Sequence, residues 1–218
     1  MTLVDDIRRA LQAAAQPERA PAQQAYMKSS MPFLGIRLPE VRRLARTLGA
    51  GESDAAALGA AARTLWDEAS HREERYAAMA LLALPPLRGA RESLPLIEHM
   101  VRTGQWWDIT DELSGRVRDL LVAHPEQIAP VIRAWARDAD LWIRRVAILS
   151  QLTRRSGFDV QLFTDVIVPN LADSEFFIRK AIGWALRDRA RVDPDGVRAF
   201  VDERGVTGLS RREALKRL

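Results

Sequence analysis

The chain has 218 residues, of which 47% are apolar, and it carries 33 basic against 29 acidic side chains. This balance is that of a folded globular protein, and it excludes a disordered or collagen-like chain. Cysteine is absent, which excludes disulfides, thiolate-bound zinc, iron–sulfur clusters and a cysteine nucleophile. We expect one domain over residues 1–218.

The chain offers no candidate for a membrane-spanning helix. Its longest apolar run, residues 76–87, has 12 residues and contains two prolines, whereas about 20 apolar residues are needed to cross a bilayer. The N-terminus places Asp5 and Asp6 where a secretory signal has basic residues. We expect a cytoplasmic protein with no membrane partner, located at the nucleoid if it binds DNA.

The net charge is +4, and 30 of the 33 basic residues are arginine. A high arginine content can reflect genome composition alone, so the distribution of charge is more informative than its total. Residues 142–155 contain four arginines and no acid, and residues 179–191 contain five basic residues against Asp188. Such positive blocks are typical of proteins that bind a polyanion.

Apolar residues recur at spacings of three and four along nearly the whole chain, which predicts an all-α protein of about a dozen helices. Three prolines suit a first helical turn, namely Pro39, Pro125 and Pro194. Plausible N-caps are Ser53, Ser93, Asp140 and Ser174. Glycines where helices should end are Gly49, Gly89, Gly157 and Gly205. The acidic pairs Asp5–Asp6 and Glu73–Glu74 are interpreted as solvated helix faces.

The sequence also repeats. Residues 106–113, 141–148 and 176–183 align at a spacing of 35, and the alignment matches Trp107 with Trp142 and Phe177, and Thr110 with Arg145 and Lys180. This period is typical of an α-solenoid built from antiparallel helix pairs, and the absence of a tetratricopeptide signature favours HEAT-like repeats. We expect the second helices of successive pairs to lie side by side, with residues near 110, 145 and 180 as neighbours on one surface.

Several kinds of chemistry are excluded by their missing motifs. His71, His99 and His124 are scattered and are interpreted as surface or helix-end residues, so no metal site is expected. The sequence has no GxGxxG, phosphate-binding loop or GxSxG, which argues against dinucleotide, nucleoside triphosphate and serine hydrolase sites. We expect no cofactor.

One segment, GQWWDITDEL at residues 104–113, suggests a site. Trp107 and Asp111 are four residues apart and share a helix face. An indole face and a carboxylate both attract a developing positive charge. The alternative is that Trp107 belongs to the core and that Asp111 caps a helix or forms an ion pair. Trp184 is similar, since it follows Arg179 and Lys180 and falls in the same helix row by the repeat register.

In several separate segments the sequence resembles the AlkD-type DNA alkylation repair enzymes. The resemblance runs from about residue 20 to the end and is carried, in order, by AYMKSSMPFLGIRLPEVRRL (25–44), LWDEASHREERYAA (65–78), QWWDITDEL (105–113), LWIRRVAILSQL (141–152), EFFIRKAIGWALRD (175–188) and LSRREALKRL (209–218). The family consists of HEAT-like-repeat glycosylases that excise positively charged N3- and N7-alkylated purines from DNA.

The resemblance assigns roles to individual residues. It places the catalytic carboxylate on Asp111, the two tryptophans flanking the lesion on Trp107 and Trp184, and the main phosphate-binding arginine on Arg145. Tyr26 matches a tyrosine near the DNA backbone, and Pro39 lies in a loop that approaches the minor groove. Family members often carry a small polar residue just before that proline, where this chain has Arg37 and Leu38. Further candidates for binding phosphates are Arg37, Lys28, Arg144, Arg154, Arg155, Arg179 and Arg187.

The resemblance implies a monofunctional alkylpurine DNA glycosylase that acts on duplex DNA as a monomer, without a cofactor and without flipping the base, along a concave basic face. Two other functions are compatible with the same fold. A catalytically silent protein that binds damaged or bent DNA would share the basic residues and differ in whether Asp111 does chemistry. A HEAT-like scaffold for protein partners would show an exposed apolar strip and no salt-dependent affinity for DNA.

Overall fold

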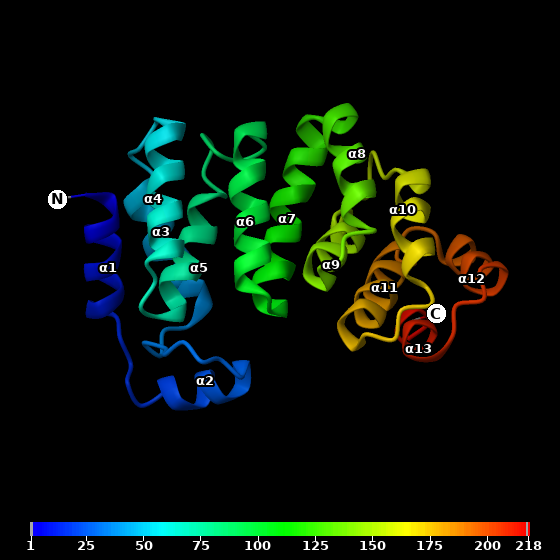
Figure 1. Ribbon diagram of the computed structural model, residues 1–218, viewed down its shortest axis with the longest axis horizontal. Helices are drawn as coiled ribbons and strands as arrows, with labels where there is room; N and C mark the ends of the chain where they lie inside the picture. The colour runs from blue at the N-terminus through cyan, green and yellow to red at the C-terminus, as the bar shows by residue number, and fades with distance from the viewer. Residues whose placement is uncertain (1, 217) are drawn as a thin grey trace. The chain divides into compact units, whose positions relative to one another are not determined.

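In a computed structural model of the protein, residues 2–216 and 218 are described; Met1, and Arg217 of the closing LSRREALKRL segment, lie outside them. The described residues form thirteen α-helices and two short 3-10 turns, and they contain no strand (Figure 1). The all-α prediction is therefore confirmed. No helix in this part of the chain is long and apolar enough to span a membrane. The chain divides into two compact units, Met1–Leu96 and Ile97–Leu218.

In the first unit, α3 and α4 pack on α5, and α1 packs on α3. The bounds are α1 Leu3–Ala13, α2 Ala20–Met27, α3 Leu38–Gly49, α4 Ala55–Asp67 and α5 Arg72–Leu81, followed by a 3-10 turn over Arg91–Ser93 and by α6, Leu94–Gly104, which crosses the division between the units. Pro39 lies in the first turn of α3, as predicted. Leu58 and Trp66 are fully buried core residues.

The interpretation of Glu73 and Glu74 as a solvated face is wrong, because both side chains are buried at the start of α5. The Glu73 carboxylate accepts the backbone N–H groups of Leu34, Gly35 and Ile36 at 2.9, 2.9 and 3.2 Å. That segment precedes α3 and has no helical partners for these donors, so a buried carboxylate satisfies them. Glu73 thereby fixes the backbone that leads into α3.

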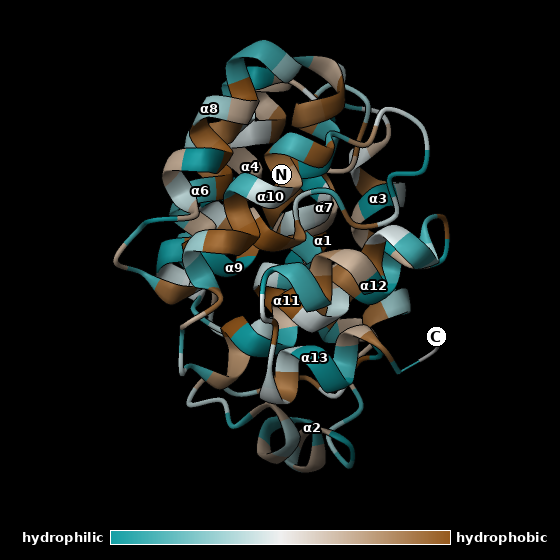
Figure 2. Ribbon diagram, turned by 90° about the vertical axis from the view of Figure 1, so that its right-hand side faces the viewer, coloured by the Kyte–Doolittle hydropathy of each residue, from teal (hydrophilic) through white to brown (hydrophobic). Residues whose placement is uncertain are grey.

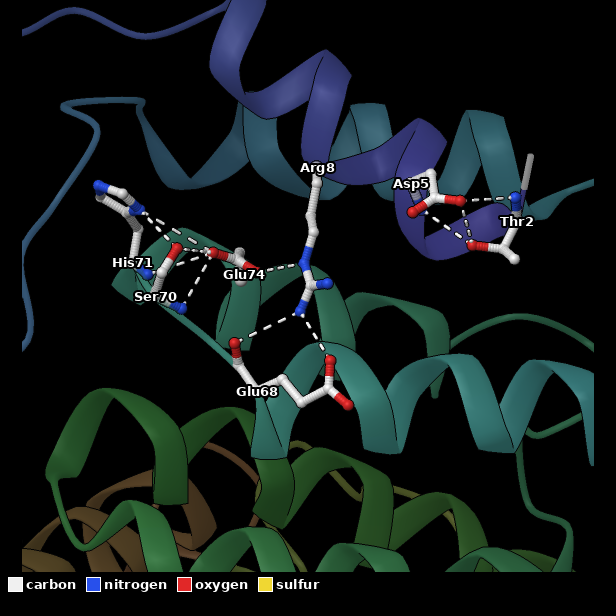
Figure 3. A network of polar contacts seen from close by, with 7 residues as sticks. All are labelled: Thr2, Asp5, Arg8, Glu68, Ser70, His71 and Glu74. Atoms are coloured by element: carbon white, nitrogen blue, oxygen red, sulfur yellow. Dashed lines mark hydrogen bonds and ion pairs between the residues drawn. The ribbon is translucent and has the colours of Figure 1, made fainter.

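Glu74 is held by a polar network that joins α1 to the start of α5 (Figure 3). It accepts hydrogen bonds from Ser70 Oγ at 2.6 Å and Arg8 Nε at 2.8 Å, and from the His71 backbone at 3.2 Å. Arg8 also lies 3.5 Å from the Glu68 carboxylate. Burial alone would raise the pKa of Glu74, but the hydrogen bonds from Ser70 and Arg8 outweigh it and hold that pKa below its usual value.

In the second unit, α7, α9 and α11 form a row in which α9 packs against both neighbours, α8 packs on α7 and α9, and α13 packs on α11 (Figure 1). The bounds are α7 Trp107–Ala123, α8 Pro125–Trp135, α9 Leu141–Leu149, α10 Val160–Ile167, a 3-10 turn over Val168–Asn170, α11 Phe176–Arg189, α12 Pro194–Glu203 and α13 Gly208–Ala214. Pro125 and Pro194 are the first residues of α8 and α12, which confirms the prediction that each lies in a first helical turn. The row matches the expected register of second helices.

The central helix of the row, α9, is buried on nearly all sides, whereas α7 and α11 each bury one face and keep partly exposed residues on the other. Ile109, Val146 and Ile182 are fully buried on α7, α9 and α11, and hydrophobic and hydrophilic residues alternate along the helices (Figure 2). The buried residues set α7, α9 and α11 side by side.

Of the four predicted N-caps, Asp140 is confirmed, because its carboxylate accepts the Trp142 N–H at 2.9 Å. The predictions for Ser53 and Ser174 are wrong, and that for Ser93, which directly precedes α6, stays a prediction. Asp54 caps α4 in place of Ser53, because its carboxylate is a stronger acceptor than a hydroxyl. The N-cap residue of α11 is Glu175 and not Ser174, and the Glu175 N–H donates to the Asp173 carboxylate. Ser93 lies in a 3-10 turn and donates to the Leu87 carbonyl at 3.2 Å.

Gly183 allows α13 to approach α11 closely. A Cβ at this position would lie 2.4 Å from the Glu213 Cβ and 3.0 Å from the Ser210 carbonyl oxygen. At this contact the Ser210 hydroxyl donates to the Arg179 carbonyl at 3.2 Å. Any side chain at position 183 would therefore push α13 away from α11.

We expect Gly183→Ala to lower the free energy of unfolding by about 1–3 kcal/mol, because the added methyl group overpacks the α11–α13 contact. Urea unfolding measures the change. Gly115→Ala on α7 is the matched control, since the nearest atom to its Cβ is a flexible arginine Nη2 at 4.0 Å; it should leave stability unchanged or raise it by up to ~1 kcal/mol. Equal destabilisation by both variants would contradict the packing assignment.

Candidate active site

A pocket of about 300 Å³ lies where α7, α9 and α11 meet. It is lined by Trp107 and Asp111 from α7, Arg145 from α9, and Phe176, Phe177, Lys180, Trp184 and Arg187 from α11. The structure thus brings the three residues predicted to be catalytic into one pocket, together with two of the predicted phosphate-binding arginines.

Helical spacing explains the lining. Trp107 and Asp111 are one turn apart on α7, and Lys180, Trp184 and Arg187 follow one another at spacings of four and three on α11. Because both helices flank α9, these two stripes border the same pocket. Trp107 and Trp184 are partly exposed, so their indole faces are accessible to a ligand.

Arg145 is buried and connects all three helices of the row. Its Nε donates to Asp111 Oδ1 at 2.8 Å, its Nη2 to Asp111 Oδ2 at 3.0 Å, and its Nη1 to the Phe177 carbonyl oxygen at 2.6 Å. Its side chain is only 5% exposed, against 19% for Asp111. In this structure the arginine therefore orients the carboxylate and is not available at the surface.

The surroundings of Asp111 disfavour the ionised form of its carboxyl group. Burial raises its pKa above the ordinary value, and the hydrogen bonds and charge of Arg145 offset this effect only in part; nearby Asp108 raises it further. One side of the carboxylate is bound by the guanidinium fork and the other faces the pocket. Such a group is well suited to stabilise a cation that forms in the pocket, because water does not solvate it fully.

An aromatic cluster holds the N-terminal ends of the row together. The ring centroids of Trp106, Trp142 and Phe177 lie 4.8–5.9 Å apart. The repeat alignment paired Trp107 with Trp142 and Phe177, but in the structure it is Trp106 that packs against these two rings. The shift by one residue is what leaves Trp107 in the pocket.

The alignment also expected Thr110 beside Arg145 and Lys180. Arg145 and Lys180 do line one pocket, but Thr110 is fully buried and its hydroxyl donates to the Trp106 carbonyl at 3.2 Å. A Thr hydroxyl readily bonds the carbonyl one turn before it. The residue of α7 that meets Arg145 is therefore Asp111.

Sequence reasoning placed Lys180 on the same surface as Arg145 without giving it a role, and it did not single out Phe176 or Glu213, which also shape the pocket. Phe176 lines it and is 57% exposed, and Lys180 lies one turn before Trp184. Glu213 of α13 bridges the cations on either side of Trp184, with its carboxylate 3.2 Å from Lys180 Nζ and 2.6 Å from Arg187 Nη1. The helical spacing of 180, 184 and 187 could have indicated Lys180, but nothing in the sequence links it to Glu213.

The remaining basic candidates of the second unit fall into two groups. Arg144 ion-pairs with Asp173 at 2.9 Å and donates to the Asp138 carbonyl at 2.8 Å. Among the described residues, no carboxylate lies within ion-pair distance of Arg154, Arg155 or Arg179.

The other predicted DNA contacts belong to the first unit. Tyr26 on α2 is 74% exposed, and the exposed Lys28 ends that helix in a left-handed conformation with a φ of 49°. Arg37 and Pro39 are exposed at the start of α3.

We expect Arg145→Met to destabilise the protein at neutral pH by about 3 kcal/mol, because it leaves the buried Asp111 carboxylate without its cation. Burial already raises the folded-state pKa of Asp111, and loss of the arginine raises it further. The added cost is present above the raised pKa and shrinks as falling pH protonates the carboxyl. Urea unfolding should therefore show the gap from wild type narrowing at acidic pH, and Asp111→Asn in the same background should recover part of the loss. A gap independent of pH and of Asp111 would contradict the pairing.

Comparison with known proteins places the chain in a family. The sequence profile of the DNA alkylation repair enzymes matches residues 7–218. The fold resembles a predicted DNA alkylation repair enzyme from Enterococcus faecalis, with a TM-score of 0.84 and 29% identity over 94% of this chain and 96% of that one. It also resembles the Pseudomonas fluorescens alkylpurine DNA glycosylase AlkC bound to DNA containing an abasic site analog, with a TM-score of 0.52 and 16% identity over 98% of this chain and 60% of that one. No curated protein matches. The chain belongs to the DNA alkylation repair enzyme family.

Proposed function

We propose that the protein is a DNA glycosylase that hydrolyses the N-glycosidic bond of positively charged N3- or N7-alkylated purines in duplex DNA. The observation that carries this proposal is the Asp111 carboxylate, which lines one pocket with the indoles of Trp107 and Trp184 and is oriented by Arg145. Membership of the alkylation repair family supports the choice of substrate.

The chemistry needs one carboxylate. An alkylated purine with a positive charge leaves readily, taking the electron pair of the C1′–N bond and becoming neutral, so it needs no general acid. The deoxyribose becomes oxocarbenium-like as that bond stretches, and Asp111 stabilises the developing charge. Water then bonds to C1′, and its proton passes to Asp111 or to solvent. The products are a free base and an abasic site.

The neighbours of Asp111 have supporting roles. Trp107 and Trp184 present indole faces that attract a cationic nucleotide. Arg145 keeps the carboxylate in one orientation by its two parallel hydrogen bonds. Water is the proposed nucleophile; the lysine in the pocket, Lys180, is engaged by Glu213. Hydrolysis by water makes the enzyme monofunctional, leaving the abasic strand unbroken.

Duplex DNA is the proposed partner, bound by a monomer through its backbone and without base flipping. AlkC, a structural relative, is bound to DNA containing an abasic site analog, and an abasic site is the product of the reaction proposed for this chain. Three basic side chains have no carboxylate partner among the described residues, and they would hold phosphates and position the duplex without reading its sequence; they are Arg154, Arg155 and Arg179.

A catalytically silent protein that binds damaged DNA is the second candidate. It is favoured by the same basic residues, but it gives no role to a carboxylate whose pKa is raised by burial beside two indoles. Base release by the purified protein separates the two functions.

We expect wild type to release free alkylpurine from methylated duplex DNA, and Asp111→Asn to reduce the rate constant at least ~10²-fold, because an amide cannot offset the oxocarbenium charge. Chromatography measures the base, and the strand should break only after alkali. Circular dichroism checks the fold, and Asp195→Asn, at an exposed ion pair on α12, is the control that should keep full activity. Full activity in Asp111→Asn would overturn the assignment.

We expect the single-turnover rate constant to fall as the pH is lowered, because the reaction needs Asp111 ionised. Burial raises its pKa, so the inflection should lie above that of an ordinary aspartate. Base release measured from about pH 4 to about pH 8, corrected for spontaneous depurination, gives the profile. The residual activity of Asp111→Asn should lack this acid limb. A wild-type rate that rises on acidification would indicate a general acid instead.

A further inference from the structure

The charged side chains that line the pocket of Asp111 are mostly of the wrong sign for a cationic ligand. Of the described residues that line it, one is acidic, Asp111, and three are basic, namely Arg145, Lys180 and Arg187. Arg145 forms two parallel hydrogen bonds with Asp111, so the charges of this pair largely cancel. Lys180 and Arg187 remain, and each repels a positive charge in the pocket. A pocket that receives a cation therefore needs a further negative group close by.

Glu213 of α13 supplies that group from behind the pocket wall, since it does not itself line the pocket. Its Oε1 lies 3.2 Å from Lys180 Nζ, and its Oε2 accepts from Arg187 Nη1 at 2.6 Å. Arg187 Nη1 also donates to the Glu213 carbonyl oxygen at 2.9 Å. The Glu213 side chain is only 13% exposed, so solvent screens these ion pairs less than it screens exposed ones.

Close packing of α13 on α11 brings this carboxylate to the two cations. Gly183 directly precedes Trp184 on α11, and a Cβ at position 183 would lie 2.4 Å from the Glu213 Cβ. The hydrogen bonds from Arg187, and then from Lys180, hold the pKa of Glu213 below its ordinary value although burial opposes them. Glu213 is therefore negatively charged at neutral pH.

The same ion pairs keep the two cations off the ring of Trp184. Lys180 lies four residues before Trp184 on α11 and Arg187 three residues after it, which is the spacing at which side chains of one helix meet. A cation over an indole face is attracted to it and would compete with a cationic ligand. In the part of the chain that the structure describes, no ammonium or guanidinium group lies over the Trp184 ring. Both cations are bound to Glu213 instead.

We propose that Glu213 determines how strongly the pocket prefers a positively charged nucleotide over a neutral one; the inference rests on the proposed function. By binding Lys180 and Arg187, it lowers the positive potential that these two side chains produce in the pocket. The general attraction for the DNA polyanion becomes weaker, and the preference for a cationic ligand becomes stronger. Asp111 faces the ligand directly, whereas Glu213 acts through the two cations that it binds.

The test uses two duplexes that carry, at one position, either a cationic pyrrolidine ring or a neutral tetrahydrofuran ring in place of deoxyribose. The ratio of their affinities measures the preference for positive charge, because the rest of the DNA is the same. Glu213→Gln should lower this ratio roughly 3- to 10-fold, the effect of one charge acting through partly solvated surroundings. The variant should bind undamaged duplex at least as tightly as wild type, because the protein gains one positive charge.

Asp202→Asn is the matched control. Asp202 pairs with Arg211 of α13 at 2.8 Å, and its side chain is 66% exposed, so this substitution changes the net charge equally without touching Lys180 or Arg187. It should leave the ratio unchanged. Adding Lys180→Gln to Glu213→Gln should return the ratio toward the wild-type value, because it removes one of the released cations. If Glu213→Gln fails to fold, Lys180→Gln alone should raise the ratio above that of wild type, and an unchanged ratio would contradict the proposal.

Two further results would overturn the proposal. One is a folded Glu213→Gln protein that keeps the full preference, or that loses no more of it than Asp202→Asn does. The other is an equal loss of affinity for the cationic, neutral and undamaged duplexes that Lys180→Gln does not reverse, which would limit Glu213 to packing α13 on α11. In both cases release of alkylpurine by wild type would leave the proposed function standing, whereas absence of release would count against that function separately.

Discussion

The candidate site depends on one buried interaction, the two parallel hydrogen bonds from Arg145 to Asp111, with a third from the same guanidinium to the Phe177 carbonyl. One side chain thereby connects α7, α9 and α11 through residues that are 34 and 32 positions away in the sequence. Placing a carboxylate in a pocket walled by aromatic rings is unfavourable by itself. The hydrogen bonds from Arg145 offset part of this cost, and the same hydrogen bonds fix the orientation of the carboxylate.

Two carboxylates, those of Asp111 and Glu213, determine how charge is distributed at the pocket. Asp111 keeps one face turned to the pocket, and its raised pKa reflects how little solvent it meets. Glu213 lies beyond Trp184 and neutralises Lys180 and Arg187 in part; those hydrogen bonds outweigh the effect of its own burial and lower its pKa. The site is thus negative where the sugar charge would form and positive along its rim, where backbone phosphates would lie.

Much of this arrangement could be predicted from local patterns. The spacing of 35 residues gave the row of helices, and spacings of three and four placed Trp107 with Asp111 and Trp184 with its basic neighbours. Periodicity says which face a residue occupies, but not which distant group it meets. For that reason the burial of Glu73 and Glu74, the place of Trp106 in the aromatic cluster, and the contact between Glu213 and Lys180 were not predicted. The resemblance assigned a phosphate-binding role to Arg145, whereas its hydrogen bonds to Asp111, 34 residues away, are not visible in the sequence.

The central claim is that Asp111 stabilises positive charge on the sugar. The most direct measurement compares the affinity of the protein for two duplexes, one with a cationic pyrrolidine ring and one with a neutral tetrahydrofuran ring in place of the same deoxyribose. Wild type should bind the cationic ring at least ~10-fold more tightly, about 1.4 kcal/mol, and Asp111→Asn should lose the preference. Equal affinity of wild type for the two rings would contradict it.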